Sequence, residues 1–454
     1  MNPALPSRLS ILSKYALTIA ILPMPLVAME VFRIAGKSIV LPHLAWIPAI
    51  LLGIFLHLTN QNCSLQHFRR FRHLHQHDMC FIAFAGWALG SSMVEDLMNP
   101  GFNPGLKPYT QFGYLLFMFI GYKALESIFR ANASGQNNTL VPACRLLVTA
   151  GSITALLALT QYAAYHLNGR VIDLFRGANI YAHYIPNSLS SPISSGVGRA
   201  LSFPASSFSF RSFASFPEPT FMAHFLTLSL LLINLAKVGR AAGFLMLLHL
   251  GGLIVSLSRT GWAATTLALA VYIALNLAAS SDFSRKKDST KPGTLLFLAL
   301  IPGLLICGTY MINRSRLTSL DDLSVHHRLA TLQTSLRALA HRPTAGHGLG
   351  SSDTVTARYM SDGHGIGYRH GGMNSIYPQI LTETGAGGFI FFTLFFLLLC
   401  NHCRGNPPLL SAIVATAIYW MGHSAINWTF IWLIIALASA FPTLTSLDTS
   451  ESGN

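Results

Sequence analysis

Four stretches of this sequence place charged or polar side chains where long apolar runs begin or end. They are "FRSFASFPEPTFMAHF" (210–225), "VSLSRTGWAAT" (255–265), the run that starts at Arg328, and "RHGGMNSIYPQILTETGAGG" (369–388). Arginine presents a planar fork that matches phosphate oxygens, and a carboxylate or a histidine can take up a proton. These residue types favour chemistry on a phosphorylated substrate.

Glu218, in the first stretch, has two interpretations. Pro219 suits the first turn of a helix, and a carboxylate beside it is stabilised by the positive end of the helix dipole. Glu218 would then be only the acidic residue at which a helix starts. The other interpretation is a carboxylate that works beside Arg211 at the outer surface of a membrane.

Arg259 and Gly261, in the second stretch, interrupt an apolar run from 242 to 279 that is too long for one membrane span. The chain must therefore turn at Arg259. Because a serine or an asparagine would serve equally well in a simple hairpin, we favour an arginine whose guanidinium points into a cavity.

The fourth stretch leads into another long apolar run. The polar residues that precede or enter the helix expected there are Asn374, Ser375, Tyr377, Gln379 and Glu383, and the glycines that allow close backbone approach are Gly385, Gly387 and Gly388. Because Glu383 lies about two helical turns beyond Asn374, we expect it to face a water-filled vestibule and not lipid.

The composition is that of an integral membrane protein. Of the 454 residues, 52% are hydrophobic and 10% are charged, and the mean hydropathy is +0.48. A soluble domain carries about 25% charged residues, and a membrane span needs about 20 apolar residues. We expect a single all-α polytopic membrane domain over 1–454, with about twelve spans and no separate soluble domain. The expected spans are 15–32, 40–58, 79–96, 112–127, 143–165, 219–236, 242–257, 261–279, 293–312, 376–399, 408–424 and 427–446.

The short basic loops set the expected orientation. Those at 69–72, 237–240 and 284–291 all fall on one side of a twelve-span topology, so that side and both termini should be cytoplasmic. The first span has no small-residue cleavage site after it, and we interpret it as retained and not as a signal peptide. Two long loops, 166–218 and 313–375, then remain on the outer side.

These two outer loops contain arginine but no lysine. A net charge of +14 also fits contact with anionic lipid, but lysine would serve that purpose equally well. The choice of arginine therefore favours an anion-binding role for at least two of them. They are Arg170, Arg176, Arg199 and Arg211 in the first loop, and Arg314, Arg316, Arg328, Arg337, Arg342, Arg358 and Arg369 in the second.

Part of the second loop has a helical pattern. Residues 328–342 repeat apolar side chains at 329, 332, 336 and 339 before Pro343, which predicts an amphipathic helix that lies on the outer leaflet. The glycine-rich stretch 346–374 has no apolar period, so we expect a flexible loop or lid there.

The sequence carries no strong metal or nucleotide motif. Cys400 and Cys403 have CxxC spacing without a second ligand pair, so a short loop is the simpler interpretation. A Walker loop, a zinc-protease helix and a serine-hydrolase elbow are also missing from the sequence. We therefore expect neither a metal nor a cofactor.

As a whole, the pattern resembles the O-antigen ligase and polymerase family of polysaccharide-assembly membrane enzymes. The resemblance extends to the architecture of most of the chain and depends on three motifs, of which the last two together are the more specific. They are "SRTGW" (258–262), "HRLATLQTSLRALAHRPTAGHGLG" (327–350) and "NSIYPQILTETGAGG" (374–388). The resemblance implies a GT-C-like glycosyltransferase of the bacterial inner membrane, which uses an undecaprenyl-pyrophosphate-linked glycan at the periplasmic face without a metal.

The resemblance also implies roles for individual residues. Arginines of the family hold the pyrophosphate, and the corresponding residues here are Arg259 and Arg328, with Arg211 as a further candidate. Ligases of the family carry a histidine eleven residues before the glycine that corresponds to Gly385, where this chain has Asn374.

An asparagine cannot act as a general base. Either His370, Glu218 or Glu383 takes that role, or the chain is not a ligase. The motif "FPEPT" (216–220) together with Asn374 is more similar to polymerases that join repeat units.

We therefore favour a glycan polymerase over a ligase that transfers the glycan to lipid A core or to a protein. The expected partners are the lipid-linked donor, a glycan or lipid A core acceptor, the bilayer and a chain-length regulator, with no nucleic acid. A transporter is less favoured, because the sequence shows no internal repeat and its polar groups gather at one face.

Overall fold

The computed structural model describes residues 4–26, 30–34, 37–61, 74–98, 106–131, 139–168, 212, 214–216, 218–280, 323–360, 373, 375–424 and 426–441. Over these residues the chain forms thirteen α-helices, two 3₁₀-helices and one β-hairpin. Four helices are long and apolar enough to cross a membrane: Lys107–Arg130, Leu140–Leu167, Arg259–Leu277 and Ile376–His402. The chain is therefore a helical membrane protein. The expected span 293–312 lies outside the described residues, and the number of twelve spans stays a prediction.

The first expected span, 15–32, is wrong at its C-terminal half. Helix α1 covers Ala4–Ile21, and after the 3₁₀-helix η1 (Met24–Leu26) the strands β1 (Glu30–Ile34) and β2 (Lys37–Val40) form an antiparallel hairpin. Pro23 and Pro25 explain the difference, because a proline cannot donate a helical hydrogen bond and clashes with the preceding turn.

The remaining helices follow the expected spans closely. They are α2 (Leu41–Gln61), α3 (Gln76–Met98), α4 (Lys107–Ala131), α5 (Leu140–Asn168), α6 (Pro219–Leu231), α7 (Ala242–Val255), α8 (Arg259–Ser280), α12 (Ile376–His402), α13 (Pro407–Tyr419) and α14 (Thr429–Ala440). Three further elements lie between expected spans: η6 (Gly239–Ala241), α10 (Leu323–His341) and α11 (Ser352–Tyr359). Helices α6, α13 and α14 are shorter than expected and belong to the shorter apolar helices.

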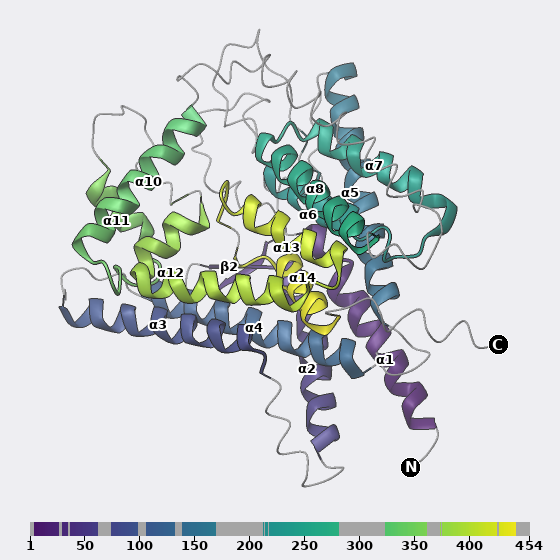
Figure 1. The fold of residues 1–454 in the computed structure, drawn as a ribbon, viewed down its shortest axis with the longest axis horizontal. Helices are drawn as coiled ribbons and strands as arrows, with labels where there is room; N and C mark the ends of the chain where they lie inside the picture. Colours follow the sequence, from purple (N-terminus) through teal and green to yellow (C-terminus); the bar gives the residue numbers. More distant parts are fainter. Residues whose placement is uncertain are drawn as a thin grey trace.

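The helices pack in two groups. In the first, α3 lies along α12, and α4 packs against α2 and α14; in the second, α5, α6 and α7 pack together and α8 packs against α6. Helix α13 contacts α6 and α8 of the second group and α14 of the first, so it joins the two (Figure 1). Large buried aromatic side chains fill the core, including Trp46, Phe81, Phe225 and Trp432.

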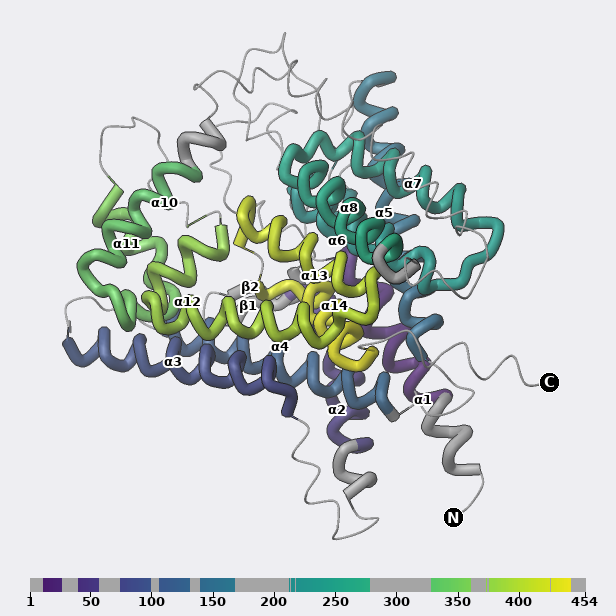
Figure 2. The backbone as a smooth tube through the Cα atoms, in the orientation of Figure 1, coloured from purple at the N-terminus to yellow at the C-terminus, as the bar shows by residue number. Residues whose placement is uncertain are grey.

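Helix α12 is broken at Gly385, where φ is 63° and ψ is −166°. Figure 2 shows that the two parts of α12 run in different directions. The segment 343–349 contacts the break, and the His347 N–H donates to the Thr382 carbonyl at 3.0 Å. Interrupted backbone in a membrane helix needs such partners from the protein, because lipid offers none.

The glycine-rich stretch after Pro343 is more ordered than the sequence predicts. Helix α11 begins at Ser352, and the side chains of His347 and Leu349 are buried. The Leu349 N–H donates to Ser92 Oγ on α3 at 2.8 Å. The prediction of a flexible loop or lid is therefore wrong for residues 346–360. His347 and Gly348 donate backbone hydrogen bonds to carbonyl groups beside the break in α12, and helix α11 follows them. Residues 361–372 lie outside the described part.

Helix α10 covers the range in which an amphipathic helix was predicted at 328–342. Its buried face is small and polar, and Ser335 Oγ donates to the Pro378 carbonyl of α12 at 3.0 Å. The leucines of the predicted stripe, Leu329, Leu332 and Leu336, are 43–51% exposed. The apolar stripe of α10 therefore faces away from α12.

Candidate active site

Arg259 is the first residue of α8 and follows a tight turn from α7. Ser258 caps the helix, since its Oγ accepts the Gly261 N–H at 3.1 Å, the bond expected of an N-cap serine. The Trp262 indole N–H donates back to the Leu253 carbonyl at 2.8 Å. The motif "SRTGW" thereby fixes the position at which the Arg259 side chain leaves the helix.

Glu218 is the N-cap residue of α6, as its position before Pro219 predicts. Its carboxylate is exposed and makes no capping hydrogen bond with the helix. The start of α6 lies beside the start of α8, because Ser258 Oγ donates to Thr220 Oγ1 at 3.4 Å. Glu218 and Arg259 are thus at the same end of the helix bundle.

The turn between α13 and α14 packs against both helix starts. The Tyr419 hydroxyl donates to the Gly261 carbonyl of α8 at 3.2 Å. A Cβ atom on Gly422 would lie 2.7 Å from the Thr260 side chain, so glycine at this position lets the turn pack closely against α8. On the α6 side, the rings of Phe221 and His423 have centroids 4.6 Å apart.

The polar start of α12 adjoins the same turn. Ser375 Oγ and the Ile376 N–H both donate to the Trp420 carbonyl at 3.0 Å. The Tyr377 hydroxyl donates to the Ala417 carbonyl at 2.7 Å. The stretch that begins "NSIYPQ" therefore borders the end of the bundle that holds Glu218 and Arg259.

His423 lies at the centre of this arrangement. Its side chain is buried, and neither ring nitrogen has a hydrogen-bond partner among the residues that the structure describes. Burial and the positive charge of Arg328 lower the pKa of His423 to about 3, so the ring is neutral near pH 7. The charge of Arg328, on α10, therefore acts on the His423 ring, which lies in the turn that packs against the starts of α6 and α8.

Three of the predicted site residues can be placed: Glu218 and Arg259 lie at the same end of the bundle, and the Arg328 charge acts on His423 in the adjoining turn. The other two catalytic candidates near α12, His370 and Asn374, lie outside the described residues, as does Arg211. Their roles stay predictions.

Glu383 is not part of this group. Its carboxylate accepts a hydrogen bond from Gln379 Nε2 at 3.1 Å and further hydrogen bonds from Gly350 and Ser352. Only 3% of Glu383 is exposed, so protein encloses the side chain instead of the expected water-filled vestibule. The difference arises because residues 343–352 fold into the space beside the break in α12. The catalytic role of Glu383 stays a prediction.

Sequence reasoning did not find His423. The stretch "GHSAINW" (422–428) falls across two expected spans, 408–424 and 427–446, so His423 lies within the first of them. Its glycine, histidine and asparagine between two apolar runs are the signal that indicates a turn. The same reasoning that singled out Arg259 therefore applies to His423.

Some of the loop arginines have structural partners. Arg342 pairs with Glu95 of α3, and Arg337 Nη1 donates to the Tyr359 carbonyl at 3.3 Å. An arginine-only loop is therefore not composed of substrate-binding residues alone, and Arg337 offers a comparison for Arg328 on the same helix.

Two other features of the described residues are less suited to the chemistry. Ligand atoms of His75, Asp78 and Glu126 lie within 4.8 Å of one another, as a metal ion would require. However, Lys123 lies 2.8 Å from Asp78 and Arg130 lies 2.7 Å from Glu126, so both carboxylates are neutralised by protein cations. We interpret this group as an ion-pair network.

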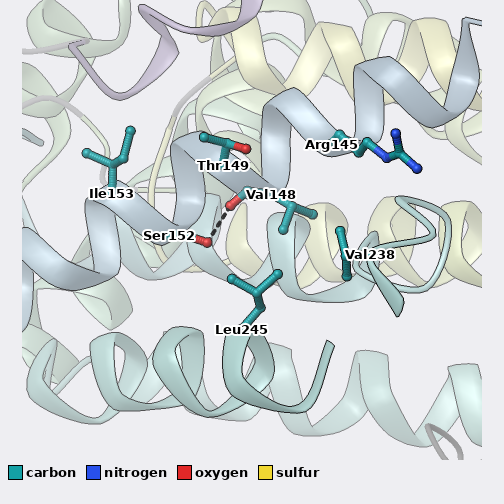
Figure 3. A pocket seen from close by; sticks show the side chains of 7 residues that line it. All are labelled: Arg145, Val148, Thr149, Ser152, Ile153, Val238 and Leu245. Carbon is teal, nitrogen blue, oxygen red and sulfur yellow. Dashed lines mark hydrogen bonds between the residues drawn. The ribbon is translucent and has the colours of Figure 1, made fainter. Parts of the chain in front are cut away.

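The second feature is a cavity of about 350 Å³ between α5 and the start of α7 (Figure 3). Arg145, Thr149 and Ser152 are its polar lining residues, and the others are apolar. Arg145 Nε donates to the Ala236 carbonyl at 2.8 Å. The cavity lacks a carboxylate or a histidine and lies at the opposite end of α7 from Arg259.

The comparison with protein families agrees with the motifs. Residues 244–393 match the family model described as O-antigen ligase, and this range contains Arg259, Arg328 and the break in α12. A search of curated proteins finds no match. Over residues 244–393, about a third of its length, the chain is therefore similar to the O-antigen ligase family.

Proposed function

We propose that this protein transfers a glycan from undecaprenyl pyrophosphate to an acceptor hydroxyl at the periplasmic face of the bacterial inner membrane. The observation that carries the proposal is the convergence of Glu218, Arg259 and Arg328 around the α13–α14 turn and the start of α12. A cationic site of this kind, at one end of the bundle, suits a lipid-linked anionic donor.

In the proposed mechanism the main task is electrostatic. A polyprenyl pyrophosphate leaves when the charge that develops on its oxygens is stabilised. Arg259 and Arg328 supply fixed cations for this task, and arginine can hold the two phosphate groups through its planar fork. Arg211 is a third proposed cation. The exposed Glu218 carboxylate lies on the acceptor side, where it would accept a hydrogen bond from a neighbouring hydroxyl of the acceptor glycan and so position the attacking one.

We favour a polymerase, whose acceptor is another lipid-linked glycan. Support comes from Asn374 at the position where ligases of the family carry a histidine, and from the motif "FPEPT" before α6. A chain-length regulator would then be a natural partner. The ligase is the second candidate, because the matching family model is described as O-antigen ligase.

The test compares two arginines of α10 with Arg259. A strain that lacks the gene is complemented with Arg259→Gln, Arg328→Gln or Arg337→Gln, and lipid-linked and surface polysaccharides are separated by chain length. We expect the first two variants to lower polymer formation about 10²–10³-fold, the effect of removing one stabilising group from a transition state. Arg337→Gln should keep normal polymer, because Arg337 bonds the Tyr359 carbonyl.

The deletion strain itself distinguishes the two candidates. A polymerase defect leaves single repeat units on the cell surface. A ligase defect leaves full-length chains on the polyprenyl carrier and none on the surface. Normal chain lengths from both Arg259→Gln and Arg328→Gln, at wild-type protein levels, would refute the pyrophosphate site.

A further inference from the structure

His423 differs from the other buried histidines around it. His224 Nε2 pairs with Thr416 Oγ1 at 3.2 Å, and His249 bonds both Ser229 Oγ and the Leu245 carbonyl. Neither nitrogen of His423 has a partner among the described residues, although only 4% of the residue is exposed. A buried polar group without a partner costs about 1–3 kcal/mol, so its position calls for an explanation.

The surroundings of His423 keep the ring neutral and in place. Phe221 and Tyr419 contact it with ring centroids 4.6 and 5.9 Å away, and the Arg328 charge disfavours the protonated ring. A neutral imidazole has one nitrogen with a lone pair, which can accept a proton. In the proposed site the negative charge of a pyrophosphate beside Arg328 offsets the arginine charge, so the ring can take up the proton while the donor is bound. Because the ring is buried, bulk water does not hydrogen-bond to that nitrogen in competition with the acceptor hydroxyl.

The geometry points to His423 as the catalytic base on the acceptor side, an inference that depends on the proposed function. In this step the acceptor hydroxyl oxygen attacks the anomeric carbon of the donor glycan, and its proton passes to a ring nitrogen of His423. The bond between the anomeric carbon and the pyrophosphate oxygen breaks, and its electron pair leaves with undecaprenyl pyrophosphate. Arg259 and Arg328 hold the leaving group.

The alternatives fit this role less well. Glu218 is exposed to solvent, and the Glu383 carboxylate already accepts hydrogen bonds from Gln379 and from Gly350 and Ser352. The amide of Asn374 has no basic nitrogen. Among the described residues, His423 therefore combines a free lone pair with a place beside the proposed phosphate-binding arginines.

The experiment measures chemistry and donor binding separately. Wild-type protein and the variants His423→Gln, His224→Gln and Arg259→Gln are purified into liposomes. Turnover is measured with an undecaprenyl-pyrophosphate-linked repeat unit, and binding with undecaprenyl pyrophosphate alone. For His423→Gln we expect kcat to fall about 10²–10⁴-fold, the usual contribution of a general base, with binding within twofold of wild type.

The two control variants have different expected results. His224→Gln can keep its bond to Thr416, and its turnover should stay within about threefold of wild type. Arg259→Gln should lose binding of undecaprenyl pyrophosphate. If His423→Gln does not accumulate as folded protein, His423→Asn, which keeps a polar group near Nδ1, takes its place.

Three results would overturn the assignment of His423. They are more than a tenth of wild-type kcat in the His423 variant, a loss of donor binding equal to its loss of turnover, and an equal loss of kcat in His224→Gln. Failure of the proposed function looks different, because wild-type protein would then not consume the lipid-linked donor, or Arg259→Gln would bind and react as wild type does.

Discussion

Substitution of Gly385 by alanine tests whether the break in α12 depends on glycine. The backbone at Gly385 has φ 63° and ψ −166°, a region essentially closed to residues with a side chain, and strain of this kind costs about 1–3 kcal/mol. An added Cβ would also lie 2.5 Å from the Thr344 carbonyl oxygen and 2.6 Å from the Gly346 nitrogen. These are backbone atoms, so they cannot rotate away as a side chain would.

The clash must separate α12 from segment 343–349. Two hydrogen bonds beside the break then weaken, from the Ala386 N–H to the Pro343 carbonyl at 2.8 Å and from the Gly387 N–H to the Thr344 carbonyl at 3.2 Å. At about 1 kcal/mol for each bond, the total loss in free energy of unfolding is on the order of 3–5 kcal/mol.

The assay combines thermal unfolding in detergent with hydrogen exchange. Gly86→Ala is the matched control, because a Cβ there meets nothing within 4 Å on helix α3 and alanine favours a helix by roughly 0.5–1 kcal/mol. Gly385→Ala should melt at a lower temperature, and the His347 amide should exchange faster. Wild-type stability together with unchanged protection of His347 would refute the reasoning.

Three further predictions concern charged side chains. Arg342→Ala should destabilise the fold by about 3–5 kcal/mol in thermal unfolding, because it removes the cation that pairs with the buried Glu95 carboxylate. Wild-type stability of the variant would show that the pair is dispensable. Glu218→Gln should lower glycan turnover at least tenfold without changing stability, since the carboxylate does not cap α6; full turnover would make it only the acidic residue that begins a helix. Lowering the pH from 7 to 5 should remove about 2 kcal/mol of stability through His423, because the unfolded ring takes up a proton near pH 6.5 while the folded ring does not until about pH 3. In His423→Gln the loss of stability between pH 7 and pH 5 should be smaller by about 2 kcal/mol. An equal loss in both proteins would show that the pKa of His423 is not lowered by folding.

The sequence predicts most helices, because an apolar run long enough to cross a membrane forms a helix in nearly every case. It also locates the turn before Arg259 and the start of α6 at Pro219, since a charged residue within an apolar run and a proline are both strong local signals. The end of α1 was missed although the signal was there, in the two prolines of "ILPMPL". An apolar run alone does not distinguish a helix from the strand that follows it.

The long-range features of the site were not predictable in this way. The break in α12 depends on segment 343–349, and Glu383 is enclosed because residues 350 and 352 reach it from another part of the chain. The sequence shows the glycines that permit such contacts but not which segment makes them. His423 was likewise hidden, because its importance comes from Arg328 and Phe221, which are distant in the sequence.

The ion-pair network between α3 and α4 bears on how the protein enters the bilayer. Asp78 is buried on α3, and its counterion Lys123 is on α4, so neither helix carries a neutral set of charges alone. A lone charged side chain raises the insertion free energy of a helix by about 3 kcal/mol at the bilayer centre and by less near a helix end, where Asp78 lies. Insertion of α3 and α4 as one hairpin would hide both charges from lipid at the same time. Helix α3 should therefore insert less efficiently from a nascent chain truncated after α3 than from one truncated after α4.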